Sequence, residues 1–221
     1  MFQDQQMKFK PGEHFHYNNA GFIVFVLIIK QHTNMPVTEY IKKIFSNGLE
    51  WLIQDFFQWI NFRKIQHMAI WRKWMVLENK YFFTPLRGGG DGGAYITAPD
   101  IGGFWKALFN YQLLRKETNE LLLSPHSQVK ATEFYGYGLW LTINDGPIFK
   151  YHVMGFDPGV NFMSSVYSTK NIELVVASNK EKGAYNITNI IEESLIRYHR
   201  KDQYLNLEVM FMKGCFRKDG C

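Results

Sequence analysis

The hydrophobic positions of residues 1–45 recur every three or four residues, which is the period of a helix with one buried face. A first helix is predicted after the polar residues 17–19. Its apolar positions are Phe22, Phe25, Val26 and Ile29. A second helix is predicted to begin at Pro36, because the missing N–H of proline needs no partner in a first turn. Its apolar positions are Val37, Ile41, Ile44 and Phe45.

A third helix is predicted just after the glycine-rich residues 88–93, whose backbone must bend tightly or approach another segment closely. Thr97 and Asp100 stand three residues apart, as in a capping box at a helix start. The helix that follows has its apolar face at Ile101, Phe104, Trp105 and Leu108.

From residue 135 onward the pattern changes to alternation, which indicates strands. The first run, residues 135–144, ends in an Asn-Asp-Gly-Pro turn signal at 144–147. Three more runs follow at residues 148–154, 162–168 and 172–178. Connections this short join antiparallel strands. Asn186 then opens a final helix with apolar positions Ile187, Ile190, Ile191, Leu195 and Tyr198.

Composition narrows the class of protein. Apolar residues make up 46% of the chain and charged residues 20%, which is typical of a globular protein. The net charge of +5 comes from scattered residues without a basic stripe, so nucleic acid is not an expected partner. The longest apolar stretch, residues 20–29, is about half of what a membrane span requires. Cys215 and Cys221 lie at the C-terminus without a neighbouring histidine, so a zinc site is not expected there. No metal or other cofactor is expected for this chain.

Three segments of the chain resemble three segments of one protein family, and they occur in the same order along the sequence. Residues 9–22, Phe-Lys-Pro-Gly-Glu-His-Phe-His-Tyr-Asn-Asn-Ala-Gly-Phe, resemble the Pro-Gly…Tyr-x-Asn segment of β-lactamases and penicillin-binding serine hydrolases. The resemblance is closest to class C enzymes and their esterase and D-aminopeptidase relatives. Residues 90–100 with Phe104 and Trp105 look like the middle segment, and residues 135–140 and 152–159 look like the C-terminal strands.

The resemblance implies an α+β fold, with an antiparallel sheet flanked by helices and a helical lobe formed by the N-terminal stretch. Residues 1–200 are expected to form this domain and residues 201–221 a C-terminal tail. The first helix and first strands of the family sheet have no counterpart here, so we expect an N-terminally truncated, incomplete domain with part of the sheet uncovered.

The resemblance also implies site residues. Family members acylate a serine, whose proton must be taken up and returned. Tyr17 matches the tyrosine that serves as the base, and Asn19 matches the asparagine that holds the substrate. Gly155 matches the glycine of the strand along which the substrate lies. Either His152 or Val153 occupies the cationic position of that strand. Without the resemblance, Tyr17 would be interpreted as a loop tyrosine and His152 as a structural residue.

The nucleophile motif of the family, Ser-x-x-Lys, is absent before Tyr17, where the sequence contains no serine. Ser127 and Lys130 have the same spacing but follow the middle segment, next to Pro125. We therefore expect a non-catalytic relative of enzymes that hydrolyse β-lactams, D-amino-acid peptides or esters. Two alternatives stay open: a pseudo-enzyme that binds peptidoglycan or peptides, and an active hydrolase that uses Ser127 or a partner chain. The chain as written lacks an export signal, which predicts a cytoplasmic protein, although intact relatives are often exported.

Residues 52–85 show neither helical nor alternating periodicity and include Trp59, Trp71 and Trp74. Translation of the same codons in a shifted frame can give family-like strings, such as Asp-Ser-Gly-Phe-Phe for residues 53–57. This favours a frame-shifted segment, with a divergent insertion as the alternative. A frame-shifted string is expected to form irregular or short helical structure.

Overall fold

The computed structural model describes residues 6–46, 70–73, 76–79, 90–92, 97–144, 146–157 and 159–198. The helices are α1 (Asn19–Thr33), α2 (Val37–Ser46), α3 (Ala98–Phe109), α4 (Lys116–Leu122) and α5 (Gly183–Tyr198). The strands are β1 (Ile70–Lys73), β2 (Val76–Asn79), β3 (Ser127–Gln128), β4 (Glu133–Tyr135), β5 (Trp140–Ile143), β6 (Ile148–Asp157), β7 (Val160–Tyr167) and β8 (Ile172–Ser178).

The central feature is a six-stranded antiparallel sheet whose strand order, β3-β4-β5-β6-β7-β8, follows the chain. This confirms the predicted α+β architecture with an antiparallel sheet. The single strand predicted at residues 135–144 is wrong, because the chain turns after β4 and returns as β5. Gly138 has a φ of +92°, which favours glycine at this turn, and Gly136 N–H donates to Leu139 O.

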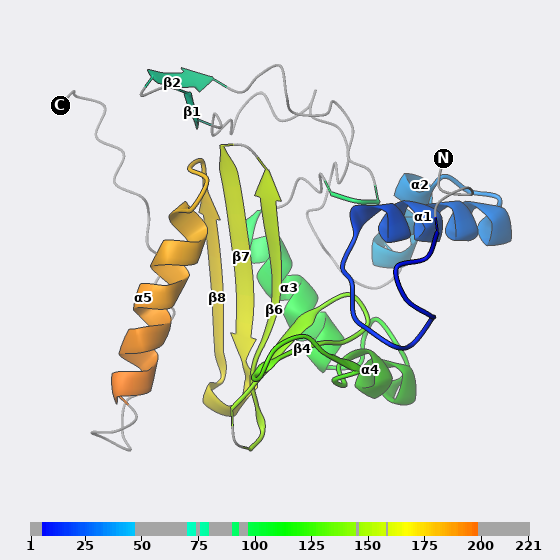
Figure 1. Cartoon of the computed structure of the whole chain (residues 1–221). Coiled ribbons are helices and arrows are strands. Elements are labelled where there is room, and N and C mark those ends of the chain that lie inside the picture. Colours follow the sequence, from blue (N-terminus) through cyan, green and yellow to red (C-terminus); the bar gives the residue numbers. More distant parts are fainter. Residues whose placement is uncertain are drawn as a thin grey trace.

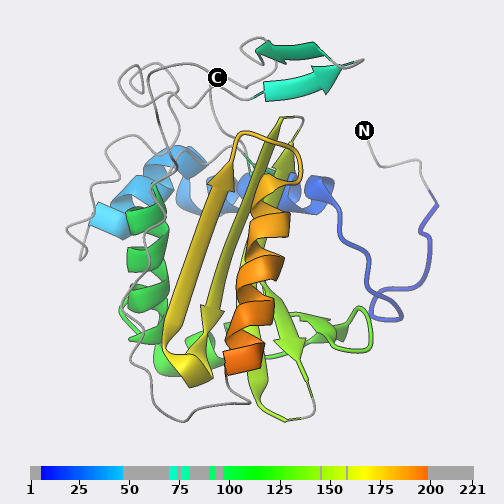
Figure 2. The same ribbon diagram turned by 90° about the vertical axis from the view of Figure 1, so that its left-hand side faces the viewer.

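Helices cover both faces of the sheet, α3 on one and α5 on the other (Figures 1 and 2). The alternation of side chains along β7 shows which face is which. Ser164 accepts a hydrogen bond from Trp105 of α3, with 2.8 Å between Nε1 and Oγ. Tyr167, three residues later and therefore on the opposite face, donates to Glu192 of α5.

Helix α3 begins as the sequence predicts. Thr97 accepts from the backbone N–H of Asp100, while the Asp100 carboxylate accepts from the backbone N–H of Thr97. This capping box satisfies two backbone donors that have no partner within the helix. Trp105 and Leu108 of α3 are buried with Val166 of the sheet, and they form the core on this face.

Helix α5 is joined to the sheet by buried polar contacts. The Lys150 ammonium lies 2.7 Å from the Glu192 carboxylate, and Tyr167 donates to the same carboxylate oxygen. Burial, and then the hydrogen bond to Glu192, raise the pKa of Tyr167 well above its usual range, so its hydroxyl stays protonated. The three side chains therefore fix the position of α5 against β6 and β7.

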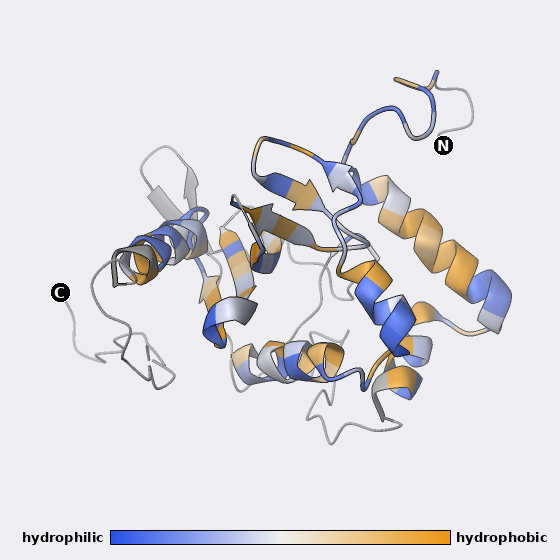
Figure 3. Ribbon diagram, turned by 90° about the horizontal axis from the view of Figure 1, so that it is seen from below, coloured by the Kyte–Doolittle hydropathy of each residue, from blue (hydrophilic) through white to orange (hydrophobic). Residues whose placement is uncertain are grey.

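The N-terminal helices α1 and α2 lie beside the sheet rather than on it (Figure 1). Helix α1 is predominantly hydrophobic (Figure 3) and has no fully buried residue. Phe25, expected on the buried face, is 60% exposed. Gly90 approaches this helix at Val26, where a Cβ atom would lie 2.2 Å from Val26 Cγ2. Glycine is therefore required where the glycine-rich loop meets α1.

Two segments with specific predictions fall largely outside the described residues. Within residues 52–85 the structure describes the antiparallel pair β1 and β2, with Ile70 opposite Asn79 and Lys73 opposite Val76. For these eight residues, the prediction of irregular or helical structure is wrong, because the two short segments satisfy each other's backbone groups in a ladder. The predicted tail at 201–221, with both cysteines, lies outside the described ranges. None of the described helices is long and apolar enough to cross a membrane.

Candidate functional site

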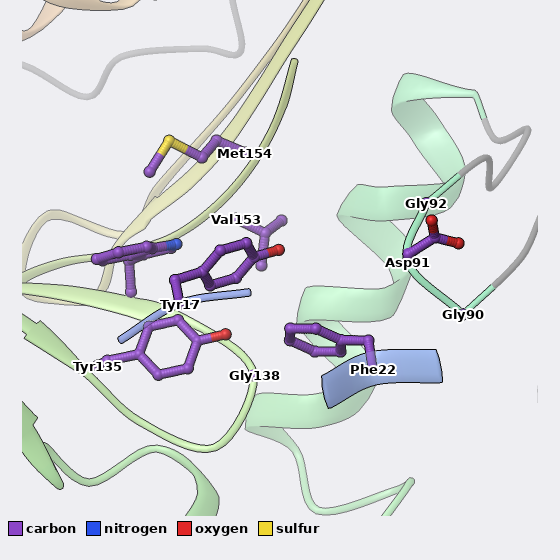
Figure 4. Close-up of a pocket in the computed structure, with 10 residues that line it drawn as sticks. Tyr17, Phe22, Gly90, Asp91, Gly92, Tyr135, Gly138, Val153 and Met154 are labelled. Carbon is purple, nitrogen blue, oxygen red and sulfur yellow. The ribbon is translucent and has the colours of Figure 1, made fainter. Parts of the chain in front are cut away.

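A pocket of about 180 Å³ opens where the start of α1, the glycine-rich loop and the edge of the sheet meet (Figure 4). It brings together the three segments on which the family resemblance rests. The lining residues are Tyr17, Phe22, Gly90, Asp91, Gly92, Tyr135, Gly138, Trp140, Val153 and Met154.

Tyr17 is held at the pocket by the turn that starts α1. The next residue, Asn18, has an extended backbone and caps the helix, with its Oδ1 2.7 Å from the backbone nitrogen of Gly21. The Tyr17 ring packs against Trp140 and Tyr135, with centroid distances of 6.1 and 6.2 Å. Tyr17 is still 45% exposed, so a ligand in the pocket can reach it.

Tyr135 provides a second phenol in the same pocket. In Figure 4 the hydroxyl groups of Tyr17 and Tyr135 both point toward the side where Phe22 lies. Burial, and to a lesser extent the nearby Tyr17, raise the pKa of Tyr135 to about 12. Tyr135 therefore stays protonated at neutral pH and can donate a hydrogen bond to a bound group.

Asn19, the expected substrate-holding amide, is the first residue of α1. Its side chain is exposed and is not one of the lining residues of the pocket. Its neighbour Asn18 uses its side-chain oxygen in the helix cap. Of these two amides, Asn19 is thus the one that the cap leaves available.

The strand that borders the pocket has a free edge. Strand β5 pairs with β6 only as far as His152, which lies opposite Trp140. Beyond that point, no described strand pairs with residues 153–157 on this side, while β7 pairs with them on the other. The free backbone edge begins at Val153 and Met154, the two β6 residues that line the pocket.

His152 is buried beneath Trp140 and is not one of the lining residues of the pocket. Its side chain is only 4% exposed and its ring stacks on Trp140, with the centroids 6.4 Å apart. Burial, and then the charge of Lys150, lower the pKa of His152 to about 3, so the imidazole is neutral at physiological pH. Of the two registers that the sequence left open, Val153 is the residue that lies at the pocket.

The carbonyl of Gly155 is turned toward β7, where the side-chain amide of Asn161 donates to it over 3.2 Å. Backbone groups of successive residues in a strand point in opposite directions. The N–H and C=O groups of Met154 and Phe156 therefore point to the free edge. A Cβ atom on Gly155 would have its nearest neighbour, Phe162 Cβ, at 4.0 Å, so the structure has room for a small side chain there.

The described lining residues include one charged side chain, the carboxylate of Asp91, and no lysine, arginine or histidine. Ser127 lies on β3, at the far edge of the sheet from β8, and does not line the pocket. Within the described ranges, no three His, Cys, Asp or Glu side chains are grouped so as to hold a metal ion.

Sequence reasoning did not identify Tyr135, Trp140 and Met154 as pocket residues. The sequence signal was present in part, since Tyr135 and Trp140 bound the Tyr-Gly-Tyr-Gly-Leu-Trp segment that carries the resemblance. Their convergence depends on the pairing of β4 with β5, which places Tyr135 directly opposite Trp140.

Comparisons with known proteins agree with this geometry. The Beta-lactamase family model matches residues 1–193. A penicillin binding protein from Bacillus halodurans is 36% identical, with a TM-score of 0.79, over 86% of this chain and 59% of its own. An octameric penicillin-binding protein homologue from Pyrococcus abyssi is 21% identical, with a TM-score of 0.68, over 86% and 44%. A D-stereospecific amidohydrolase from Streptomyces sp. is 16% identical, with a TM-score of 0.62, over 80% and 54%. No curated protein matches the chain.

The two more distant structures show the fold alone, whereas the family model covers most of the chain. The 221 residues span 59% of the length of the Bacillus halodurans protein. The predicted fold, an antiparallel sheet flanked by helices with a helical lobe, is the fold of these relatives. The chain therefore belongs to the Beta-lactamase family of serine hydrolases.

Proposed function

We propose that this chain forms two walls of a serine-hydrolase cleft, one made by Tyr17 and the other by the free edge of β6. We also propose that its 221 residues do not by themselves form an acyl-enzyme. The observation that carries the proposal is the meeting of Tyr17, the glycine-rich loop and the free edge of β6 in one pocket. Residues this far apart in the sequence line one pocket only because the strands and α1 place them there.

Each wall has its own chemistry. The accessible hydroxyl of Tyr17 is the proposed proton-transfer group, and Asn19 is the proposed amide donor to the substrate. The backbone groups of Met154 and Phe156 at the free edge would pair with an extended substrate, as an added strand does. We propose that Val153 occupies the family's cationic position at the pocket, and that buried His152 supports the Trp140 ring on which it stacks.

Relatives suggest the class of substrate. Solved structures of similar fold include a D-stereospecific amidohydrolase and a D-amino acid amidase from Ochrobactrum anthropi SV3 complexed with D-phenylalanine. β-Lactams, D-amino-acid amides or peptides, and esters are therefore the proposed ligands of the cleft. All three present a carbonyl group that the phenols and the strand edge can contact.

The test of the first proposal is covalent labelling. The purified chain is incubated with a fluorescent penicillin and, separately, with a fluorophosphonate, and intact-mass spectrometry measures adduct formation. We expect no stoichiometric adduct, because no Ser-x-x-Lys precedes Tyr17 and Ser127 lies outside the pocket. An adduct that forms on the wild type and disappears in Ser127→Ala would contradict the proposal.

A second candidate function is that of a binding module for peptidoglycan-type peptides, which the open edge and the aromatic pocket favour. Isothermal titration with D-phenylalanine amide and with a D-Ala-D-Ala peptide measures this directly. Gly155→Ala serves as the probe variant because the structure has room for its methyl group. We expect Gly155→Ala to unfold at the wild-type urea concentration but to bind more weakly. Equal binding by both proteins would show that no ligand lies along this strand.

A further inference from the structure

Asn161 on β7 connects two elements beside the pocket. Its side-chain Nδ2 donates to the backbone carbonyl of Gly155 on β6 over 3.2 Å, and its Oδ1 accepts from the backbone N–H of Tyr185 over 2.9 Å. The residue itself is only 8% exposed. Asn161 thus joins the strand that carries the free edge to the first turn of α5.

The two contacts together need a side chain that offers both a donor and an acceptor. A carbonyl needs a donor and an N–H needs an acceptor, and a single asparagine side chain offers one of each on neighbouring atoms. The first intrahelical bond in this region is donated by the next residue, Asn186, to Lys182 O. The N–H of Tyr185 is thus one of the helix-start donors that lack a partner in the helix, and Asn161 caps it from another element.

The contact to Gly155 lies in the part of β6 that β5 no longer pairs with. From Val153 to Asp157 the strand is paired with β7 alone among the described strands. An edge held from one side depends on that ladder for its position. The Asn161 amide adds a side-chain hydrogen bond on the same side, at the middle of the free segment.

We propose that Asn161 is a positioning residue. It fixes the free edge of β6 beside the pocket, because its one side chain binds both the Gly155 carbonyl and the Tyr185 N–H at the start of α5. Its consequence for ligand binding rests on the proposed function of the cleft. Asn161 does not line the pocket and so acts through Gly155. Its importance lies in keeping the backbone groups of Met154 and Phe156 directed at a ligand.

Two variants separate the two contacts. Asn161→Asp, studied at pH 8 so that the carboxylate is ionised, still accepts from Tyr185 N–H but cannot donate to Gly155. Asn161→Ala removes both contacts. Hydrogen exchange followed by NMR reports the two sites separately. The Tyr185 N–H is itself the donor to Asn161, whereas the Gly155 N–H faces β7, opposite Phe162, so its exchange reports how often this part of the β6–β7 ladder opens. Urea midpoints measured in parallel give the global stability of each variant.

We expect Asn161→Asp to speed the exchange of the Gly155 N–H about fivefold, because loss of the hydrogen bond to the Gly155 carbonyl makes local opening of the ladder easier by about one net hydrogen bond, and to leave the Tyr185 N–H protected. Asn161→Ala should speed the exchange of both amides. Unchanged exchange of Gly155 in Asn161→Asp would overturn the positioning role and reduce Asn161 to a helix cap.

Ligand affinity supplies the second readout, with D-phenylalanine amide titrated into the three proteins and followed through the indole signal of Trp140. We expect both variants to bind about fivefold more weakly than the wild type. Weakening in Asn161→Ala but not in Asn161→Asp would overturn the link to the pocket. If the wild type itself does not bind, the proposed function fails, and the exchange pattern alone decides the role of Asn161.

Discussion

The buried imidazole of His152 should make the stability of this protein depend on pH. His152 is 4% exposed, its Nδ1 has no hydrogen-bond partner within the described residues, and the positive charge of Lys150 lowers its pKa further. All three features oppose protonation in the folded state. In the unfolded chain, by contrast, the same imidazole is hydrated and takes up a proton near its ordinary pKa of 6.5.

The sign and size of the effect follow from these two pKa values. Burial, then the Lys150 charge, lower the folded-state pKa to about 3, so between pH 6.5 and pH 3 the unfolded state binds a proton that the folded state does not. The contribution of the neutral imidazole to the free energy of unfolding is therefore fully present above the unfolded-state pKa and is lost as the pH is lowered. The loss between pH 7 and pH 5 is about 2 kcal/mol, and the full shift corresponds to about 5 kcal/mol.

The assay is urea unfolding at pH 7 and at pH 5, for the wild type and for His152→Phe. Phenylalanine keeps an aromatic ring against Trp140 and removes the titrating group and its unpartnered nitrogen. All other titrating groups are common to both proteins, so the difference between their pH effects isolates His152. We expect the wild type to lose about 2 kcal/mol more than the variant over this interval. Equal losses in both proteins would refute the reasoning.

Two further predictions concern buried polar contacts. Ser164→Ala should lower the free energy of unfolding by about 1–3 kcal/mol in the urea assay, because it leaves the buried indole N–H of Trp105 without an acceptor. Thr188→Val is the control: it removes a buried hydroxyl that has no partner within the described residues, and it should leave the free energy of unfolding almost unchanged. Glu192→Gln should destabilise the protein by about 3–5 kcal/mol, because it leaves the nearly buried ammonium of Lys150 without its carboxylate. A thermal melt of the Glu192 variant that matches the wild type would show that the contact does not hold α5 to the sheet.

The sequence alone determined several of the local elements and the family. The helix start at Thr97 could be predicted because a capping box needs only two residues three positions apart, and Asp100 supplies the second. The last two strands could be predicted because alternation reflects the covalent geometry of a single chain segment. Tyr17 was singled out by the motif around it, and it lies in the pocket; its chemical role stays a prediction.

Only the tertiary structure decided which side chains share the site. Whether His152 or Val153 lies at the pocket depends on where β5 stops pairing with β6, which no single segment of sequence reveals. The last pair joins Trp140 to His152 and the Trp140 ring covers the histidine, so the free edge at the pocket begins at Val153. The link from Asn161 to Gly155 and α5 is equally invisible in the sequence, because hydrogen bonds between distant elements depend on how the whole chain packs.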